Sequence, residues 1–110
     1  MPAYRKNRAR SAPSTMGRDA VNFRHIDLSL LMALDALVTE RSVTKAAERL
    51  HISQPAMSHA LARLRSVFDD PILVRGKGGM VPTTKAVRIL GPTRQAICEL
   101  EKSLAPFRHF

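Results

Sequence analysis

Polar side chains gather at the start of one helical pattern within the stretch SVTKAAERLHISQPAMSHALARLR, residues 42–65. Ser53 is a favourable N-cap, and Pro55 suits the first helical turn, where its missing N–H costs nothing. These signals predict a helix from about residue 54 to about residue 68, with an apolar stripe of Met57, Leu61 and Leu64. Its other faces carry Gln54, Ser58, His59, Arg63 and Arg65. Amides, hydroxyls and guanidinium groups of this kind form hydrogen bonds with the edges of nucleic-acid bases.

A shorter helical pattern comes directly before it. Ser42 is placed to cap VTKAAERLH, and Ala46 and Ala47 on its buried side permit a neighbouring helix to approach closely. Two helices joined by so short a turn cross at a large angle, so the first supports the second. We therefore predict that these two helices form a tightly joined pair in which the second is presented to a partner.

The second helix of such a pair fits the major groove of B-DNA. At its start, Gln54 can pair with adenine and Ser58 with either kind of base edge, while Arg63 can reach guanine or phosphate. The N–H groups near Ser42 and Thr44, at the start of the first helix, are suited to phosphate. If the second helix served only for packing, it would not need polar side chains in its first turn.

The same residue types show no pattern of catalysis. Ser58 and His59 are adjacent in the chain, which is not a nucleophile–base arrangement, and Asp69 and Asp70 are expected to end the helix. The histidines do not fall at metal-binding spacings with Cys98 or with paired carboxylates; they are His25, His51, His59 and His109. We predict no enzymatic activity, no metal and no cofactor.

Composition agrees with a nucleic-acid partner. The 110 residues allow one domain, and 18 Lys and Arg against 9 Asp and Glu give a net charge of +9. A small domain this basic binds polyanions, with nucleic acid the first candidate and an anionic membrane the second. No apolar run approaches the length of a membrane-spanning helix, and one cysteine fits a reducing compartment. A transit peptide is a minor alternative for the N-terminus; we expect a cytoplasmic protein with no membrane partner.

Residues 1–25 contain six Lys or Arg against one Asp and show no helical or strand period, so they are predicted to form a flexible basic arm. The arm either follows DNA phosphates or is a disordered leader. A first core helix follows from Asp27, which is placed as its N-cap, with leucines at helical spacing.

After this three-helix core, residues 72–82 have the pattern of a small hairpin, with two short apolar runs around a glycine-rich turn. Arg75 and Lys77 near its tip make the hairpin basic, as a DNA-binding wing is. The alternative is a solvated turn with incidental charge.

Residues 83–107 form a long helical pattern whose apolar positions alternate in steps of four and three. This spacing is typical of a coiled-coil face and favours self-association, although the face could pack on the chain's own core. Gly91-Pro92 predicts either a bend or a break into two helices, of which we favour a bend. The predicted dimer seam consists of Ala86, Leu90, Ile97, Leu100 and Leu104.

The run from about residue 24 to about residue 105 resembles the N-terminal domain of the LysR-type transcriptional regulators, with AAERLHISQPAMS as the most specific part. SQPAMS and DPILVRGKGGMVPT are similar to the nodulation-regulator branch. The resemblance implies a mainly α fold: a winged helix-turn-helix over residues 26–82, with the helix-turn-helix itself at about residues 43–62, and a linker helix over 83–107 that pairs subunits. Carried over by motif, the base or groove contacts are Gln54, Pro55, Ser58, His59 and Arg63. Phosphate and wing contacts are assigned to Ser42, Thr44, Ser53, Arg75 and Lys77.

The chain also departs from the family pattern. Val43 stands where an aromatic residue is frequent, the basic arm is longer than usual, and the sequence stops where the family continues into an effector domain. We therefore expect either an excised DNA-binding fragment or a natural bare domain. A small-molecule inducer is expected only if an effector domain exists.

These observations predict a dimeric, sequence-specific binder of double-stranded DNA, with an oligomer larger than a dimer left open. Two other functions remain open at this stage. The chain could hold RNA or bulk DNA through its arm, or it could pair with longer relatives and block them.

Overall fold

The computed structural model describes residues 23–107. Residues 1–22 of the predicted basic arm lie outside the described residues, whereas its last three form the 3-10 helix η2. Four α-helices and a two-stranded hairpin follow one another as predicted, so the mainly α, winged helix-turn-helix fold is confirmed. In chain order the elements are η2 (Phe23–His25), α2 (Leu28–Glu40), α3 (Val43–Leu50), α4 (Gln54–Phe68), β1 (Leu73–Gly76), β2 (Gly79–Pro82), α5 (Thr84–Leu104) and η3 (Ala105–Phe107).

Helix α2 is the centre of the core, and α3, α4 and α5 all pack against it. The predicted cap is present: the Asp27 carboxylate accepts a hydrogen bond from the Leu30 N–H at 2.8 Å. Apolar residues at intervals of three and four place one face of α2 in the interior. Its buried residues are Leu30, Ala33, Leu34, Ala36, Leu37 and Val38.

The cap of α2 makes stability depend on pH. The hydrogen bond from the Leu30 N–H, and next that from the Ser29 hydroxyl, lower the pKa of the Asp27 carboxyl. Because the folded pKa lies below the unfolded value of about 3.9, this stabilisation is present above that pH and is lost as the pH falls through the folded pKa. We expect the wild-type chain to lose its stability advantage over Asp27→Asn, which keeps a neutral cap, only in this acid range.

Urea unfolding of both proteins from neutral to acidic pH measures this difference. Wild-type and variant curves that ran parallel across the whole range would mean that the Asp27 charge contributes nothing.

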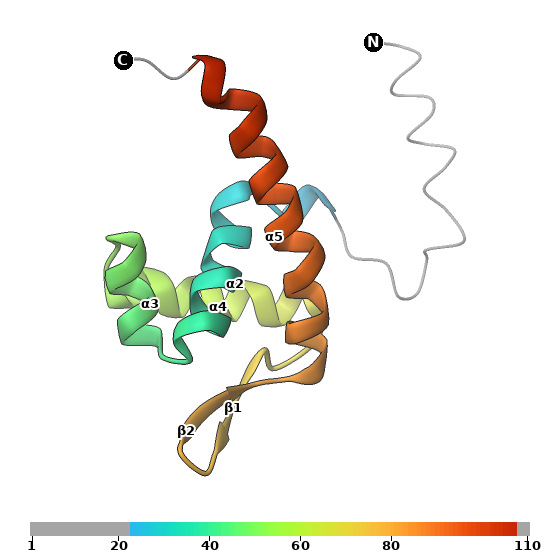
Figure 1. The fold of residues 1–110 in the computed structure, drawn as a ribbon. Coiled ribbons are helices and arrows are strands. Elements are labelled where there is room, and N and C mark those ends of the chain that lie inside the picture. The colour runs from blue at the N-terminus through green and yellow to red at the C-terminus, as the bar shows by residue number, and fades with distance from the viewer. Residues whose placement is uncertain (1–22, 108–110) are drawn as a thin grey trace, which may run out of the picture.

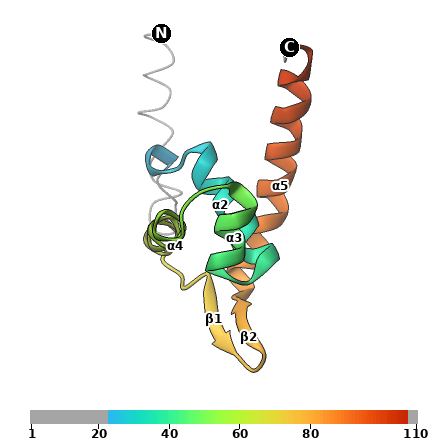
Figure 2. The same cartoon turned by 90° about the vertical axis from the view of Figure 1, so that its left-hand side faces the viewer.

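Helix α4 crosses the other helices. It runs along the horizontal of Figure 1 behind α2 and is seen end-on in Figure 2, where α2 and α5 stand upright. Met57, Leu61, Leu64 and Phe68 form its buried stripe, which is the predicted stripe extended by one turn. The opposite side of α4 faces solvent.

The hairpin projects from one end of the helical core (Figure 1). Its strands pair antiparallel, with Leu73 opposite Pro82 and Gly76 opposite Gly79, so Lys77 and Gly78 form a two-residue loop. Gly79 has a φ of 128°, which favours glycine, and a Cβ on Gly76 would collide with the Val81 side chain. Gly76 and Gly79 are thus the glycines of GKGG that the hairpin requires, whereas a side chain at Gly78 would meet no neighbouring atom.

Helix α5 continues through Pro92 without a break, so the two-helix alternative is wrong. A proline within a helix costs about 3 kcal/mol because one backbone hydrogen bond is lost. Contacts with α2 hold α5 near this point: the Arg94 Nε lies 2.9 Å from Asp35 Oδ1, and its Nη2 lies 2.6 Å from Thr39 Oγ1. These contacts keep α5 aligned along α2.

The predicted seam on α5 is corrected at its N-terminal end. Ala86 and Leu90 are buried in the chain's own core, because the first half of α5 closes the side of the core that the three preceding helices leave open. Only the second half stays accessible: Ile97 is half-buried, whereas Leu100 is 40% and Leu104 54% exposed. This half extends beyond the core at the end opposite the hairpin (Figure 1).

Candidate nucleic-acid interface

The connection between α3 and α4 consists of three residues. His51 has a φ of 58°, in the left-handed region, and its N–H donates to the Glu48 carbonyl at 3.1 Å. The Ile52 N–H donates to the Ala47 carbonyl at 3.0 Å, and these bonds end α3 as a left-handed cap does. Ser53 then starts α4 by accepting from the Ala56 N–H at 3.1 Å. His51 is thus the C-cap of α3.

The first two turns of α4 present three polar side chains and a proline to solvent. Gln54, Pro55, Ser58 and His59 are all exposed, whereas the intervening Met57 is fully buried. Because Met57 packs into the core, the helix cannot rotate its polar side inward without exposing that side chain. The residues predicted to contact bases are thus brought together on one accessible surface, except for Arg63.

Arg63 lies two turns further along and is held by the chain itself. Its Nη2 donates to the His25 carbonyl oxygen at 3.1 Å and lies 3.8 Å from the Asp27 carboxylate. The side chain is 40% exposed, so its attraction to Asp27 is screened by water and is weak. In this structure Arg63 ties α4 to η2 and to the start of α2 and does not extend beside Gln54 and Ser58.

The residues predicted to contact phosphates lie on two elements. Ser42 caps α3 by accepting from the Lys45 N–H at 3.1 Å, and Thr44 in the first turn of α3 is exposed. A capping hydroxyl can still donate its own hydrogen, so Ser42 and Ser53 keep a donor for a phosphate oxygen. Arg75 and Lys77 are exposed on the hairpin.

Sequence analysis missed the contacts at the base of the hairpin. Asp70 was assigned only to ending α4, yet its carboxylate accepts hydrogen bonds from Ile72 and Thr83. Arg65, which the pattern placed on the polar side of α4, donates to the carbonyls of Pro71 and Leu73. The partners are up to 13 residues apart in the chain, and no periodic signal predicts such pairs.

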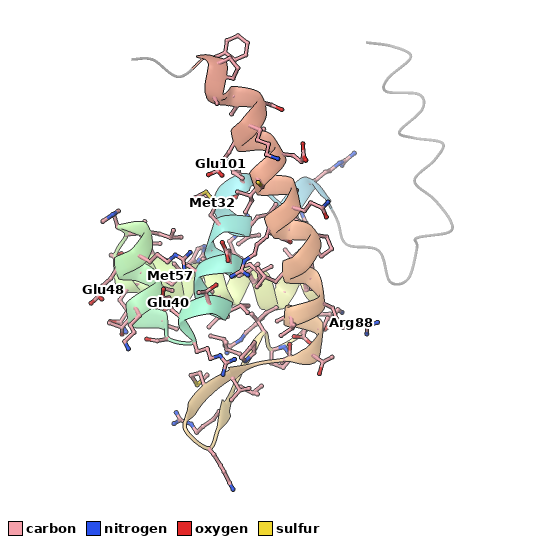
Figure 3. The ribbon with its side chains drawn as sticks, viewed as in Figure 1. Met32, Glu40, Glu48, Met57, Arg88 and Glu101 are labelled. Atoms are coloured by element: carbon pink, nitrogen blue, oxygen red, sulfur yellow. The ribbon has the colours of Figure 1, made fainter. Side chains whose placement is uncertain are left out.

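An apolar groove of about 540 Å³ lies between the start of α2, the end of α4 and α5. Ile26, Leu31, Phe68, Ile89, Pro92, Thr93 and Ala96 line it, together with Lys85 and Arg88. Figure 3 shows Arg88 extending outward from α5, on the side away from α3. The groove reaches Ala96, one helical turn before the exposed Leu100.

Within residues 23–107, no group of His, Cys, Asp and Glu side chains is arranged to hold a metal ion. No helix in the same range combines the length and the apolar character needed to cross a membrane.

The model of the bacterial regulatory helix-turn-helix proteins of the lysR family matches residues 28–87, more than half of the chain. The chain belongs to the lysR family. The matched segment contains every residue assigned above to base, phosphate or wing contacts, whereas Ile97, Leu100 and Leu104 lie beyond it.

Curated relatives confirm the predicted branch of this family. Nodulation protein D 2 of Bradyrhizobium elkanii is 48% identical over 84 residues, which cover 76% of this chain and 25% of that protein. Nodulation protein D 2 of Sinorhizobium fredii is 41% identical over 90 residues, 82% of this chain and 29% of that protein. The chain thus spans about a quarter of the length of the curated relatives it matches.

Solved structures of other regulators share the fold. A probable transcriptional regulator from Pseudomonas aeruginosa superposes with a TM-score of 0.73 at 40% identity, covering 80% of this chain and 30% of that one. The DNA-binding domain of BenM, solved as a complex with catB site 1 DNA, superposes with a TM-score of 0.66 at 25% identity. That match covers 73% of this chain and 86% of the BenM domain.

Proposed function

We propose that this lysR-family chain binds a specific double-stranded DNA sequence as a dimer, with α4 in the major groove, and serves in transcription regulation. The observation that carries the proposal is the exposed polar surface of Gln54, Ser58 and His59 at the start of α4, directly after a short turn. Such a turn lets the first residues of the second helix reach base edges. The crystallised DNA complex of the related BenM domain supports the same partner. Because that partner is chromosomal DNA, we place the protein in the cytoplasm.

Contacts with the phosphate backbone come from elements on either side of the recognition helix. Ser42 and Thr44 lie at the start of α3, Ser53 lies at the start of α4, and Arg75 and Lys77 lie on the wing. The net charge of +9 adds a general attraction to the polyanion. Affinity should therefore fall steeply with salt, by about 0.9 in log–log slope for each phosphate neutralised.

The dimer is proposed to form through the second half of α5. Leu100 and Leu104 are exposed large apolar residues, and Phe107 just after the helix is 81% exposed. The apolar groove beside α5 continues this surface through Ile89, Pro92 and Ala96, so a second copy would cover both. Pairing by two-fold symmetry would place two recognition helices about 34 Å apart or a multiple of that distance.

Selection from a random duplex library at elevated salt tests the whole proposal. A two-fold symmetric enriched site would support a dimeric sequence reader and would supply the operator. Binding without enrichment, lost as salt rises, would contradict sequence-specific recognition and leave general affinity for nucleic acid.

Gln54→Ala tests the recognition helix itself. The amide can form two hydrogen bonds with adenine, so its loss should remove about 1–3 kcal/mol of discrimination at one base pair of the selected site. Competition binding with duplexes changed at single positions measures this loss. Gln95→Ala, the same change on an exposed position of α5, is the matched control. Equal weakening on specific and random duplexes would mean that Gln54 does not read a base.

A further inference from the structure

The wing packs on the core mainly through Leu73, with Met80 partly buried beside the same cluster, and most of its other strand residues are exposed. Among residues 23–107, its two strands of four residues form a sheet by themselves. An isolated two-stranded hairpin is marginally stable at best. The orientation of Arg75 and Lys77 relative to α4 therefore depends on how the base of the hairpin is attached.

That base is closed by one carboxylate. Asp70 Oδ2 accepts from the Ile72 N–H at 2.9 Å and from the Thr83 hydroxyl at 2.6 Å. The Thr83 N–H in turn donates to the Ile72 carbonyl at 2.9 Å. Thr83 Oγ1 also accepts from the Ala86 N–H at 3.0 Å, as the N-cap of α5. These bonds connect the end of α4, the entry to β1 and the start of α5.

A cation on α4 holds the other side of the same base. Arg65 donates from Nε to the Pro71 carbonyl at 2.9 Å and from Nη2 to the Leu73 carbonyl at 3.4 Å. Leu73 is the first residue of β1, so Arg65 links α4 directly to the wing by a hydrogen bond. Hydrogen bonds from a charged group of fixed fork geometry restrict direction as well as distance.

The segment between these contacts has an unusual backbone. Ile72 has a φ of 65°, in the left-handed region, which is rare for a β-branched residue. Its side chain is fully buried, and both its N–H and its carbonyl are engaged by the contacts above. Such a conformation persists only where the surroundings determine it.

We propose that Asp70, Thr83 and Arg65, here called the wing clamp, are positioning residues for DNA binding: they hold the wing so that Arg75 and Lys77 reach the phosphate backbone while α4 occupies the major groove. This inference rests on the proposed function and adds to it a role for residues that need not touch DNA. Asp70 is the critical member because its carboxylate accepts hydrogen bonds from both the Ile72 N–H and the Thr83 hydroxyl.

Asp70→Ala tests the clamp in the full chain, with random-sequence duplex DNA as the probe. Loss of two phosphate contacts should reduce the log–log salt slope of the affinity by about 1.8, as Arg75→Ala/Lys77→Ala should. Combining all three changes should produce no further reduction, because the clamp acts through those two cations. Removing a carboxylate would by electrostatics alone strengthen binding to a polyanion, so weakening identifies positioning.

Two variants and one exchange measurement serve as controls. Asp70→Asn keeps an acceptor oxygen and should preserve the slope. Asp69→Asn removes the same charge one residue earlier, at a left-handed position that asparagine tolerates, and should also preserve it. Hydrogen exchange of the Ile72 and Thr83 amides should accelerate in Asp70→Ala alone.

The outcomes separate the two proposals. If the wild-type chain binds duplex with the expected salt dependence but Asp70→Ala keeps its slope, or the combined variant loses more, the clamp is overturned and the proposed function stands. If the wild-type chain shows no salt-dependent duplex binding, both are overturned. If circular dichroism shows that Asp70→Ala does not fold, Arg65→Lys is measured in its place. This variant keeps the positive charge but loses the two-nitrogen geometry of the guanidinium group. A wild-type slope in Arg65→Lys would then overturn the clamp.

Discussion

Leu100→Asp is expected to convert the proposed dimer into a folded monomer. Leu100 is 40% exposed on the part of α5 that extends beyond the core, so a carboxylate there leaves the monomer intact but cannot be buried against a second copy. Losing simultaneous contact with two half-sites should reduce affinity for the selected operator by about 10²–10⁴-fold. Affinity for a single half-site should change little.

Sedimentation equilibrium and binding to whole and half operators measure these effects. Gln95→Asp adds the same charge to α5 at an exposed position away from the seam and should leave both the dimer and the affinity unchanged. Circular dichroism should show the same helix content in all three proteins. An unchanged dimer mass for Leu100→Asp would place the subunit contact elsewhere, for instance in the groove beside Pro92.

Met57→Ala is expected to give the largest loss of stability, about 2–5 kcal/mol. Met57 is fully buried on the inner side of α4, between turns whose outer residues are proposed to meet DNA. Since small domains are stable by about 5–15 kcal/mol, such a loss removes a large fraction of the free energy of unfolding. Urea unfolding followed by circular dichroism measures the change.

Ser58→Ala is the matched control for this experiment. It alters the neighbouring exposed position and should change stability by less than about 0.5 kcal/mol while weakening discrimination between DNA sequences. Met57→Ala should show the reverse, with normal sequence preference in the molecules that remain folded. Altered preference in Met57→Ala and unaltered preference in Ser58→Ala would contradict the assignment of inner and outer faces.

The helices were predictable because their signals are local. Asp27, Ser42 and Ser53 each cap the helix that follows them, and each does so with a side chain three residues before its backbone donor. The glycine-rich turn between two short apolar runs likewise predicted a hairpin. Gly79, at the start of β2, has the positive φ that glycine tolerates. The exposed positions of Gln54, Ser58 and His59 followed from the apolar stripe on the opposite side of the same helix.

The seam on α5 shows where a periodic pattern is ambiguous. A spacing of four and three predicts that one side of a helix is covered, but it contains no information on whether the cover is the same chain or a second one. The structure divides the pattern: Ala86 and Leu90 are covered by α2 and its neighbours, and Leu100 and Leu104 are not. This division arises because the core ends before α5 does, so the last turns of α5 stay exposed.

The sequence by itself determined the family, the order of the helices and the hairpin, and the polar surface at the start of α4. Each depends on residues a few positions apart, whose backbone and capping preferences act locally. Only the tertiary structure decided that Arg63 is held by His25 and Asp27, that Asp70 joins Thr83 across the base of the wing, and which half of α5 remains exposed. These contacts join segments that are distant in the chain, and they exist only once packing on α2 has brought those segments together.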